Sequence, residues 1–228
     1  MENQLLSHPV GRQIVVGDIH GCFATFKALL EDKIQITQDD QLILLGDIIN
    51  RGPSSRKVLD YLLTLELSHE VYCIRGNHEH NFLIAYECGV DFFEQFLSEC
   101  NAEDLLEGDV HTYLDFCARM PYFLETPTHL LSHMGFSSDF PPRMSDTRSF
   151  FHQQKLVVNL AAINSKKQVH GHVVKPLNYI LEEVRAEKKQ ITIDGGCWYG
   201  ERDGLGYLCA LDLNSNELFT QKNKEPIA

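Results

Sequence analysis

The sequence contains no long apolar run. None of its 228 residues belongs to a membrane-length apolar stretch, and residues 1–11 have no apolar core of the kind found in signal peptides. We therefore expect a cytoplasmic protein with no membrane partner. Internal repeats and low-complexity tracts are also absent, and this length suits one domain with a sizeable core. The simplest prediction is a single domain over residues 1–228.

Positive charge is scarce as well. Lys and Arg number 20 against 32 Asp and Glu, which gives a formal net charge of −12. Such an acidic chain is unsuited to nucleic acid as its main partner, because phosphate backbones are anionic. Acidity suits the binding of cations. If the substrate is itself anionic, bound metals and local arginines must reverse the field in the site.

The cysteines are not spaced like those of a zinc-binding or disulfide-bonded domain. There are seven, an odd number, and no two are spaced CxxC, so the sequence predicts neither a zinc ribbon nor a set of disulfides. Buried, reduced thiols are the expected state. Cys197 lies near the polar segments described next, but no partner base accompanies it that would make it a nucleophile.

What the sequence does contain is a set of short apolar runs that each end in polar residues. Bounded runs of this length predict buried strands, and open parallel sheets bind ligands just beyond the carboxyl ends of their strands. The sequence therefore predicts a site built from Asp, His, Asn and Arg side chains. The runs are residues 42–45 before GDIINRG (46–52), residues 14–16 before GDIHG (17–21), and residues 71–74 before RGNHE (75–79).

Asp18 and His20 show the chemistry that such a site would have. They lie two residues apart between Gly17 and Gly21, so a tight turn can direct both side chains at one cation. Carboxylate oxygen and imidazole nitrogen together suit manganese, iron or zinc better than calcium, and the thiolates of a structural zinc site are missing.

The remaining pattern predicts an α/β protein whose second half is rich in strands. The spacing of apolar residues predicts several helices, and Pro53 is expected in the first turn of the helix that covers residues 54–65. Residues 137–149 are expected to form a loop. The later strands are expected to pair as antiparallel hairpins. Predicted helices cover residues 22–31, 54–65, 79–86, 91–100, 109–119 and 156–163, and predicted strands cover 129–132, 168–170, 179–184, 190–194, 206–213 and 217–220.

The motifs GDIHG, GDxxNRG and GNHE, in this order and spacing, resemble those of the calcineurin-like metallophosphoesterases, specifically the phosphoprotein phosphatase group. Downstream, Ser132-His133, Gly171-His172 and the DGG segment at 194–196 resemble the later motifs of that group. The resemblance covers nearly the whole chain. It implies an α/β fold of two packed mixed β-sheets, a β-sandwich flanked by helices.

The resemblance also implies a ligand set for two divalent metal ions. Manganese is the expected metal, with iron or zinc as alternatives. A hydroxide that bridges the metals would attack the phosphorus atom, so no Ser or Cys nucleophile is needed. By this resemblance Asp18, His20 and Asp47 would hold one metal, while Asp47, Asn77, His133 and His172 would hold the other, with Asp47 as the bridge.

Further residues receive roles from the same resemblance. His78 would protonate the leaving oxygen. Asn50 departs from the protein-phosphatase pattern, which has Asp at this position; it can orient the ring of His78 but supplies no charge. Arg51 would bind the phosphoryl oxygens. Asp194 would orient a metal-binding histidine. A second phosphate-binding arginine is expected in the interval that holds Arg143 and Arg148, and the surrounding sequence does not choose between them.

Three functions compete. The leading prediction is a phosphomonoesterase that resembles bacterial Ser/Thr protein phosphatases and acts on phosphoproteins or small phosphoesters. The alternative is a hydrolase of dinucleoside polyphosphates, because GDIINRGP, with Asn50 where protein phosphatases carry Asp, and DGGCW resemble the symmetrical diadenosine tetraphosphatases. The short interval between His133 and His172 speaks against that alternative. A non-catalytic scaffold is disfavoured, because such a scaffold would be expected to have lost ligands or His78.

Overall fold

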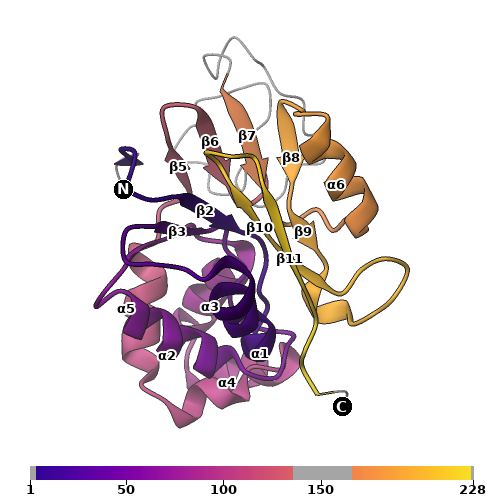
Figure 1. The fold of residues 1–228 in the computed structure, drawn as a ribbon. Helices are drawn as coiled ribbons and strands as arrows, with labels where there is room; N and C mark the ends of the chain where they lie inside the picture. The colour runs from indigo at the N-terminus through magenta and orange to yellow at the C-terminus, as the bar shows by residue number, and fades with distance from the viewer. Residues whose placement is uncertain (1–3, 136–165, 227–228) are drawn as a thin grey trace.

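The computed structural model describes residues 4–135 and 166–226, whose strands form two sheets packed face to face (Figure 1). In both sheets parallel and antiparallel pairs occur together, which confirms the predicted fold class. The first sheet has the order β1 (Gln4–Leu5), β5 (Phe123–Glu125), β6 (His129–Ser132), β7 (Lys167–His170) and β8 (Gln190–Thr192). The second has the order β11 (Leu218–Lys222), β10 (Tyr207–Asp212), β2 (Gln13–Val16), β3 (Gln41–Leu44) and β4 (Glu70–Cys73), and β9 (Asp194–Gly195) pairs with β10.

Most helices cover the outer face of the second sheet, while α6 packs beside β8 at the other side of the molecule (Figure 1). Within the described ranges, no helix has the length and apolar character that crossing a bilayer requires. The helices are α1 (Phe23–Ala28), which continues as a π-helical turn (Leu29–Ile34), α2 (Ser55–Leu65), α3 (Asn77–Glu87), α4 (Val90–Glu99), α5 (Val110–Arg119) and α6 (Leu177–Arg185), with short 3₁₀ turns at Glu103–Glu107 and Cys197–Tyr199.

Both faces of strand β2 are buried, which explains why its run of apolar residues is unbroken. Ile14 and Val16 pack into the core between the second sheet and the helices, which also contains Phe26 of α1. Val15 points the other way and packs into the core that contains Leu131 of the first sheet. A strand with both faces buried needs apolar residues at every position, and each such side chain contributes about 1.5–3 kcal/mol when it is buried.

One predicted strand is wrong. Residues 179–184 belong to α6, where Ile180 and Val184, four residues apart, are buried on one helix face. The segment between β7 and β8 is therefore a helical crossover, so β8 pairs with β7 in parallel and not as a hairpin. Pro53 also precedes the N-cap of α2, Ser54, instead of lying in the first turn. The predicted helix over 156–163 and loop over 137–149 lie outside the described residues.

The cysteines fit the expectation of free thiols. All seven are unpaired and five are buried, while Cys88 is exposed and Cys100 is half-buried. Burial raises the pKa of the Cys197 thiol, as does its hydrogen bond with Cys22, which is the larger effect. A thiol that resists ionisation is a poor nucleophile.

Candidate metal centre

The polar motifs meet at one edge of the sandwich, because strands of both sheets end there. Asp18 and His20 follow β2, and Asp47 follows β3. From the first sheet, His133 follows β6 and His172 follows β7. Parallel strands bring their carboxyl ends to the same edge, so residues that are distant in sequence become neighbours.

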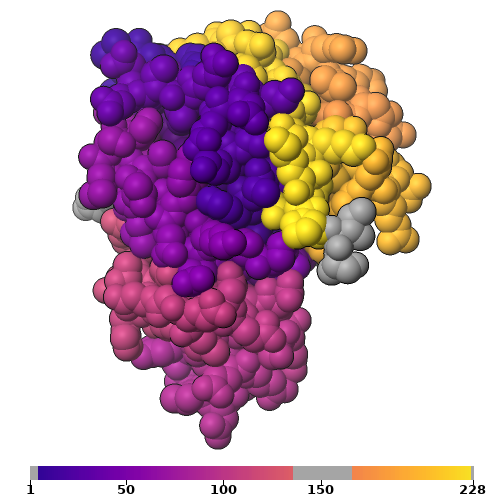
Figure 2. Space-filling view, turned by 60° about the horizontal axis from the view of Figure 1, so that its bottom comes forward, coloured from indigo at the N-terminus to yellow at the C-terminus, as the bar shows by residue number. Residues whose placement is uncertain are grey.

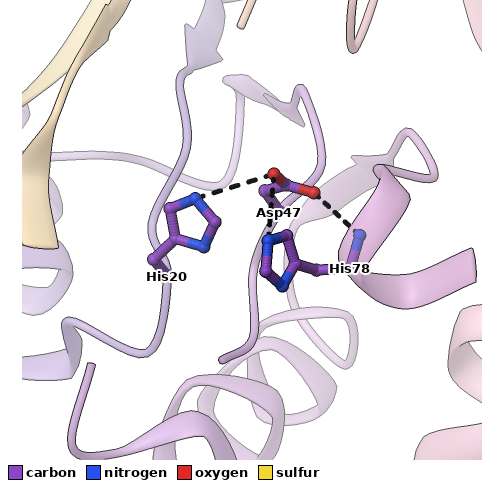
Figure 3. Close-up of side chains that lie close together, drawn as sticks. All are labelled: His20, Asp47 and His78. Atoms are coloured by element: carbon purple, nitrogen blue, oxygen red, sulfur yellow. Dashed lines mark hydrogen bonds and ion pairs between the residues drawn. The ribbon is translucent and has the colours of Figure 1, made fainter. Parts of the chain in front are cut away.

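Asp47 lies at the centre of this cluster (Figure 3). Its Oδ2 atom lies 3.4 Å from His133 Nε2, 3.6 Å from His20 Nε2 and 3.9 Å from His78 Nε2. Two groups of potential metal ligands share it: His20 with Asp47 and His78, and Asp47 with His133 and His172. A carboxylate shared by two groups is the arrangement expected of a bridging ligand.

His133 ties the second group together. Its Nε2 lies 3.0 Å from both Asn77 Oδ1 and His172 Nδ1. Asn77 is the first residue of α3, so the start of this helix places the amide oxygen among the histidines. Amide oxygen, carboxylate oxygen and imidazole nitrogen therefore converge on one point.

Asp18 connects the two sheets at the site. Both of its carboxylate oxygens accept from the backbone N–H of His172 at 3.1 Å, and Oδ2 lies 4.0 Å from His20 Nε2. A Cβ atom at Gly171 would collide with Asp18 Oδ1, so only glycine allows this approach. Burial raises the pKa of Asp18 well above its ordinary value, and the neighbouring charge of Asp194 adds to the effect.

Backbone carbonyls orient the histidines. His133 Nδ1 lies 3.0 Å from Leu45 O and His20 Nδ1 lies 3.3 Å from Ile49 O, so both rings present Nε2 to the centre. Within the described residues, the side-chain hydrogen bond of Asp194 is made with Gly196 N–H at 2.9 Å. Among the described residues Asp194 makes no hydrogen bond with a histidine, so its orienting role stays a prediction.

Glu79 is a functional residue that the sequence interpretation missed. Its fully buried carboxylate accepts backbone N–H groups of Asp47 (2.9 Å), Ile48 (2.8 Å), Ile49 (3.3 Å) and Gly76 (2.9 Å). These bonds fix the loop after β3 against the start of α3. The signal was present in the sequence, because Glu three residues after a helix N-cap is a capping pattern.

Many of the site residues have strained backbones. Positive φ angles occur at His20 (49°), Asp47 (49°), Asn50 (72°), Arg51 (70°) and His172 (61°). For residues with a Cβ atom, each such angle costs about 1–2 kcal/mol. Strain of this kind gathers at functional sites and persists only where the surroundings hold it.

The electrostatics favour a bound cation. Burial lowers the pKa of His20 to about 3 and that of His172 to about 4, so both rings are neutral near pH 7. Burial is the largest single effect on His133 and lowers its pKa, but the charge of Asp47, the hydrogen bond with Asp47 and the charges of Asp18 and Glu79 together outweigh it and raise the pKa to about 10. The site thus stabilises positive charge beside Asp47. Neutral imidazoles, carboxylates and an amide oxygen, without thiolates, fit two divalent cations of the manganese, iron or zinc type.

His78 and Arg51 lie at the border of this cluster. Asn50 Nδ2 is 2.9 Å from His78 Nδ1, and burial lowers the pKa of His78. Asn50 is fully buried, and its Oδ1 has no partner within ranges 4–135 and 166–226. The exposed Arg51 guanidinium lies over the Trp198 ring, 4.9 Å from its centre. Arg143 and Arg148 lie outside the described residues.

A family model for the calcineurin-like phosphoesterases matches residues 11–210. The chain belongs to this family. The predicted family is therefore confirmed.

Related proteins differ in the substrates that their names state. A symmetrical bis(5'-nucleosyl)-tetraphosphatase of Buchnera aphidicola is 37% identical over 167 residues, 69% of this chain and 57% of that protein. This calcineurin-like chain thus matches little more than half the length of that relative. A zinc-dependent endopolyphosphatase of Saccharomyces cerevisiae is 42% identical over 74 residues, 32% of this chain and 22% of that protein.

Solved structures agree on the fold. A Ser/Thr phosphatase from Saccharomyces cerevisiae has a TM-score of 0.61 at 15% identity, with 99% of this chain and 84% of that chain covered. A candidate diadenosine tetraphosphatase has a TM-score of 0.62 at 22% identity, with 96% and 97% covered. At these identities the likeness concerns the calcineurin-like fold and not the substrate.

Proposed function

We propose that this chain is a two-metal hydrolase of phosphoanhydrides whose substrates are dinucleoside polyphosphates, split symmetrically into two nucleotides. The observation that carries the proposal is the contact between Asn50 and His78. Cleavage of a phosphate ester of an alcohol expels a strongly basic oxygen and needs a general acid that is protonated at the working pH, whereas cleavage of an anhydride expels a phosphate that needs little protonation. Asn50 supplies no charge that would keep His78 protonated near neutral pH, and burial lowers the pKa of that ring, so its protonated form is less populated.

The names of the relatives support this proposal. Symmetrical bis(5'-nucleosyl)-tetraphosphatase and endopolyphosphatase both denote enzymes of polyphosphate chains. The leading sequence prediction, a phosphatase of phosphoproteins, therefore gives way to what was the alternative. It remains a second candidate because of the short interval between His133 and His172.

The ligands proposed for the two cations are those that the resemblance implies. One cation would be held by Asp18, His20 and Asp47, and the other by Asp47, Asn77, His133 and His172. Manganese is the proposed metal, with iron or zinc as alternatives. When bound, the cations would supply Lewis-acid stabilisation of the phosphoryl oxygens and lower the pKa of water.

The side chains of the protein perform the remaining steps. Arg51 has a planar fork of N–H donors and would bind the phosphoryl oxygens of the attacked phosphate. When Asn50 donates through Nδ2, His78 Nδ1 is the acceptor and the proton stays on Nε2, the nitrogen that faces Asp47. His78 would therefore donate a hydrogen bond from Nε2 to the leaving oxygen.

A metal-reconstituted substrate panel tests the proposal. The purified chain is supplied with manganese and offered diadenosine tetraphosphate, a phosphoseryl peptide and p-nitrophenyl phosphate. We expect ADP as the nucleotide product from the first, at a higher kcat/KM than phosphate release from the peptide. Preferred hydrolysis of the peptide, or formation of AMP and ATP from the dinucleotide, would contradict the proposal.

A further inference from the structure

A groove runs along the surface next to Arg51. Its cavity volume is about 410 Å³, and it lies between the loop after β3 and the segment after β9. Arg51 and Pro53 line one side, and Trp198 and Tyr199 line the other. Figure 2 shows that the C-terminal part of the chain, in yellow, lies against the indigo N-terminal part. Glu225, which also lines the groove, accepts hydrogen bonds from the backbone N–H and the hydroxyl of Thr25.

One side of the groove is aromatic. The rings of Trp198 and Tyr199 lie 4.2 Å apart between centres, tilted by 34°, and Tyr199 is 39% exposed. Arg51 lies over the Trp198 ring. A guanidinium can stack on an aromatic face and still offer its N–H edge to a phosphate. Arg51 can therefore bind a phosphate of the substrate while it contacts the aromatic side of the groove.

The charges that line the groove cancel. Of the described residues that line it, Arg51 and Lys222 are the cations, Glu201 and Glu225 are the anions, and Lys222 is paired with Glu201 at 2.5 Å. Beyond Arg51 the lining therefore offers a second phosphate no net positive charge, whereas a neutral flat group with N–H or O–H donors would be accepted.

We propose that this groove binds the nucleoside of the substrate half whose phosphate contacts Arg51, with the base stacked on the exposed ring of Tyr199, next to Trp198. The inference rests on the proposed function. It assigns a binding site for the nucleoside, which would let the protein distinguish nucleotides from phosphates that lack one. Base stacking on aromatic side chains tolerates any base, because every base has a π-face. The groove thus selects for a nucleoside without fixing which one.

Fluorescence provides a test that does not depend on turnover, because Trp198 is the single tryptophan of the chain. The full-length protein, with magnesium present, is titrated with ADP and separately with inorganic pyrophosphate. We expect ADP to quench the emission saturably and to bind more tightly than pyrophosphate. Equal affinities and equal changes in emission would overturn the proposal.

Two variants of Tyr199 separate stacking from a merely structural role. Tyr199→Leu should raise the Kd for ADP, relative to that for pyrophosphate, by about 5- to 100-fold, the usual effect of losing one stacked aromatic ring. Tyr199→Phe keeps the ring and should bind ADP as the unmodified protein does. If both variants weaken ADP binding equally, the ring does not stack on the base.

Kinetics distinguish failure of this inference from failure of the proposed function. With diadenosine tetraphosphate as substrate, Tyr199→Leu should raise KM and change kcat little. If the dinucleotide is hydrolysed but the variant has an unchanged KM, the groove assignment alone is wrong. If the dinucleotide is not hydrolysed and ADP still quenches Trp198, the proposed substrate is wrong and the nucleoside site stands.

Discussion

Replacement of Glu79 by Gln tests whether one buried carboxylate holds the loop after β3 in place. Each carboxylate oxygen accepts two backbone N–H groups: Oε1 those of Ile48 and Ile49, and Oε2 those of Asp47 and Gly76. The amide of Gln has the same shape but a single acceptor oxygen. Its NH₂ group would face two N–H donors and leave them without an acceptor.

The expected loss of stability follows from the number of N–H groups left unpaired. A buried donor without a partner costs roughly 1–3 kcal/mol, so two of them should lower the free energy of unfolding by roughly 2–6 kcal/mol. With a urea m-value of about 2 kcal/mol/M, the midpoint of unfolding should fall by roughly 1–3 M. Because Asp47 N–H is one of the donors, metal affinity should also fall, by about 10- to 100-fold.

Urea unfolding followed by circular dichroism measures the first effect, and titration with a metal indicator measures the second. Glu94→Gln is the matched control, because Glu94 is exposed on α4 and its replacement removes the same charge. If the two variants unfold within about 0.5 kcal/mol of each other, a difference typical of surface substitutions, Glu79 does not hold the loop.

Three further predictions concern the chemistry of the site. Removal of metal with a chelator should abolish activity, and manganese should restore it. Elemental analysis should find two metal ions per chain. Asp47→Asn should reduce the metal content more than His172→Ala, because Asp47 belongs to both ligand groups. His78→Asn should lower turnover on an alkyl phosphate by about 10²- to 10⁴-fold and on p-nitrophenyl phosphate by much less, and equal losses would show that His78 is not the acid. Asn50→Asp would place an anion beside His78 Nδ1 and raise the pKa of that ring, so the alkaline limb of the rate profile should move to higher pH and turnover of a phosphoseryl peptide should rise relative to p-nitrophenyl phosphate. An unmoved limb would contradict this.

The sequence was most informative where a buried strand ends in a polar motif. Asp47 and His133 follow strands at the predicted positions, because an apolar run with both faces buried leaves little choice of structure. Tyr179 to Val184 was mispredicted, since short apolar patterns do not separate a strand from a half-buried helix. The capping pattern of Gly76 and Glu79 is visible in the sequence, but the hydrogen bonds of Glu79 with N–H groups of a loop about 30 residues away are not, because no local pattern reveals them.

The positive φ angles at His20, Asp47, Asn50, Arg51 and His172 have a consequence for engineering. Glycine at these positions would relieve backbone strain but would remove a proposed ligand, a positioning group or the phosphate-binding fork. Selection for heat resistance alone would thus favour variants that keep the fold and lose the chemistry. Efforts to stabilise this protein should keep these five residues and make substitutions elsewhere.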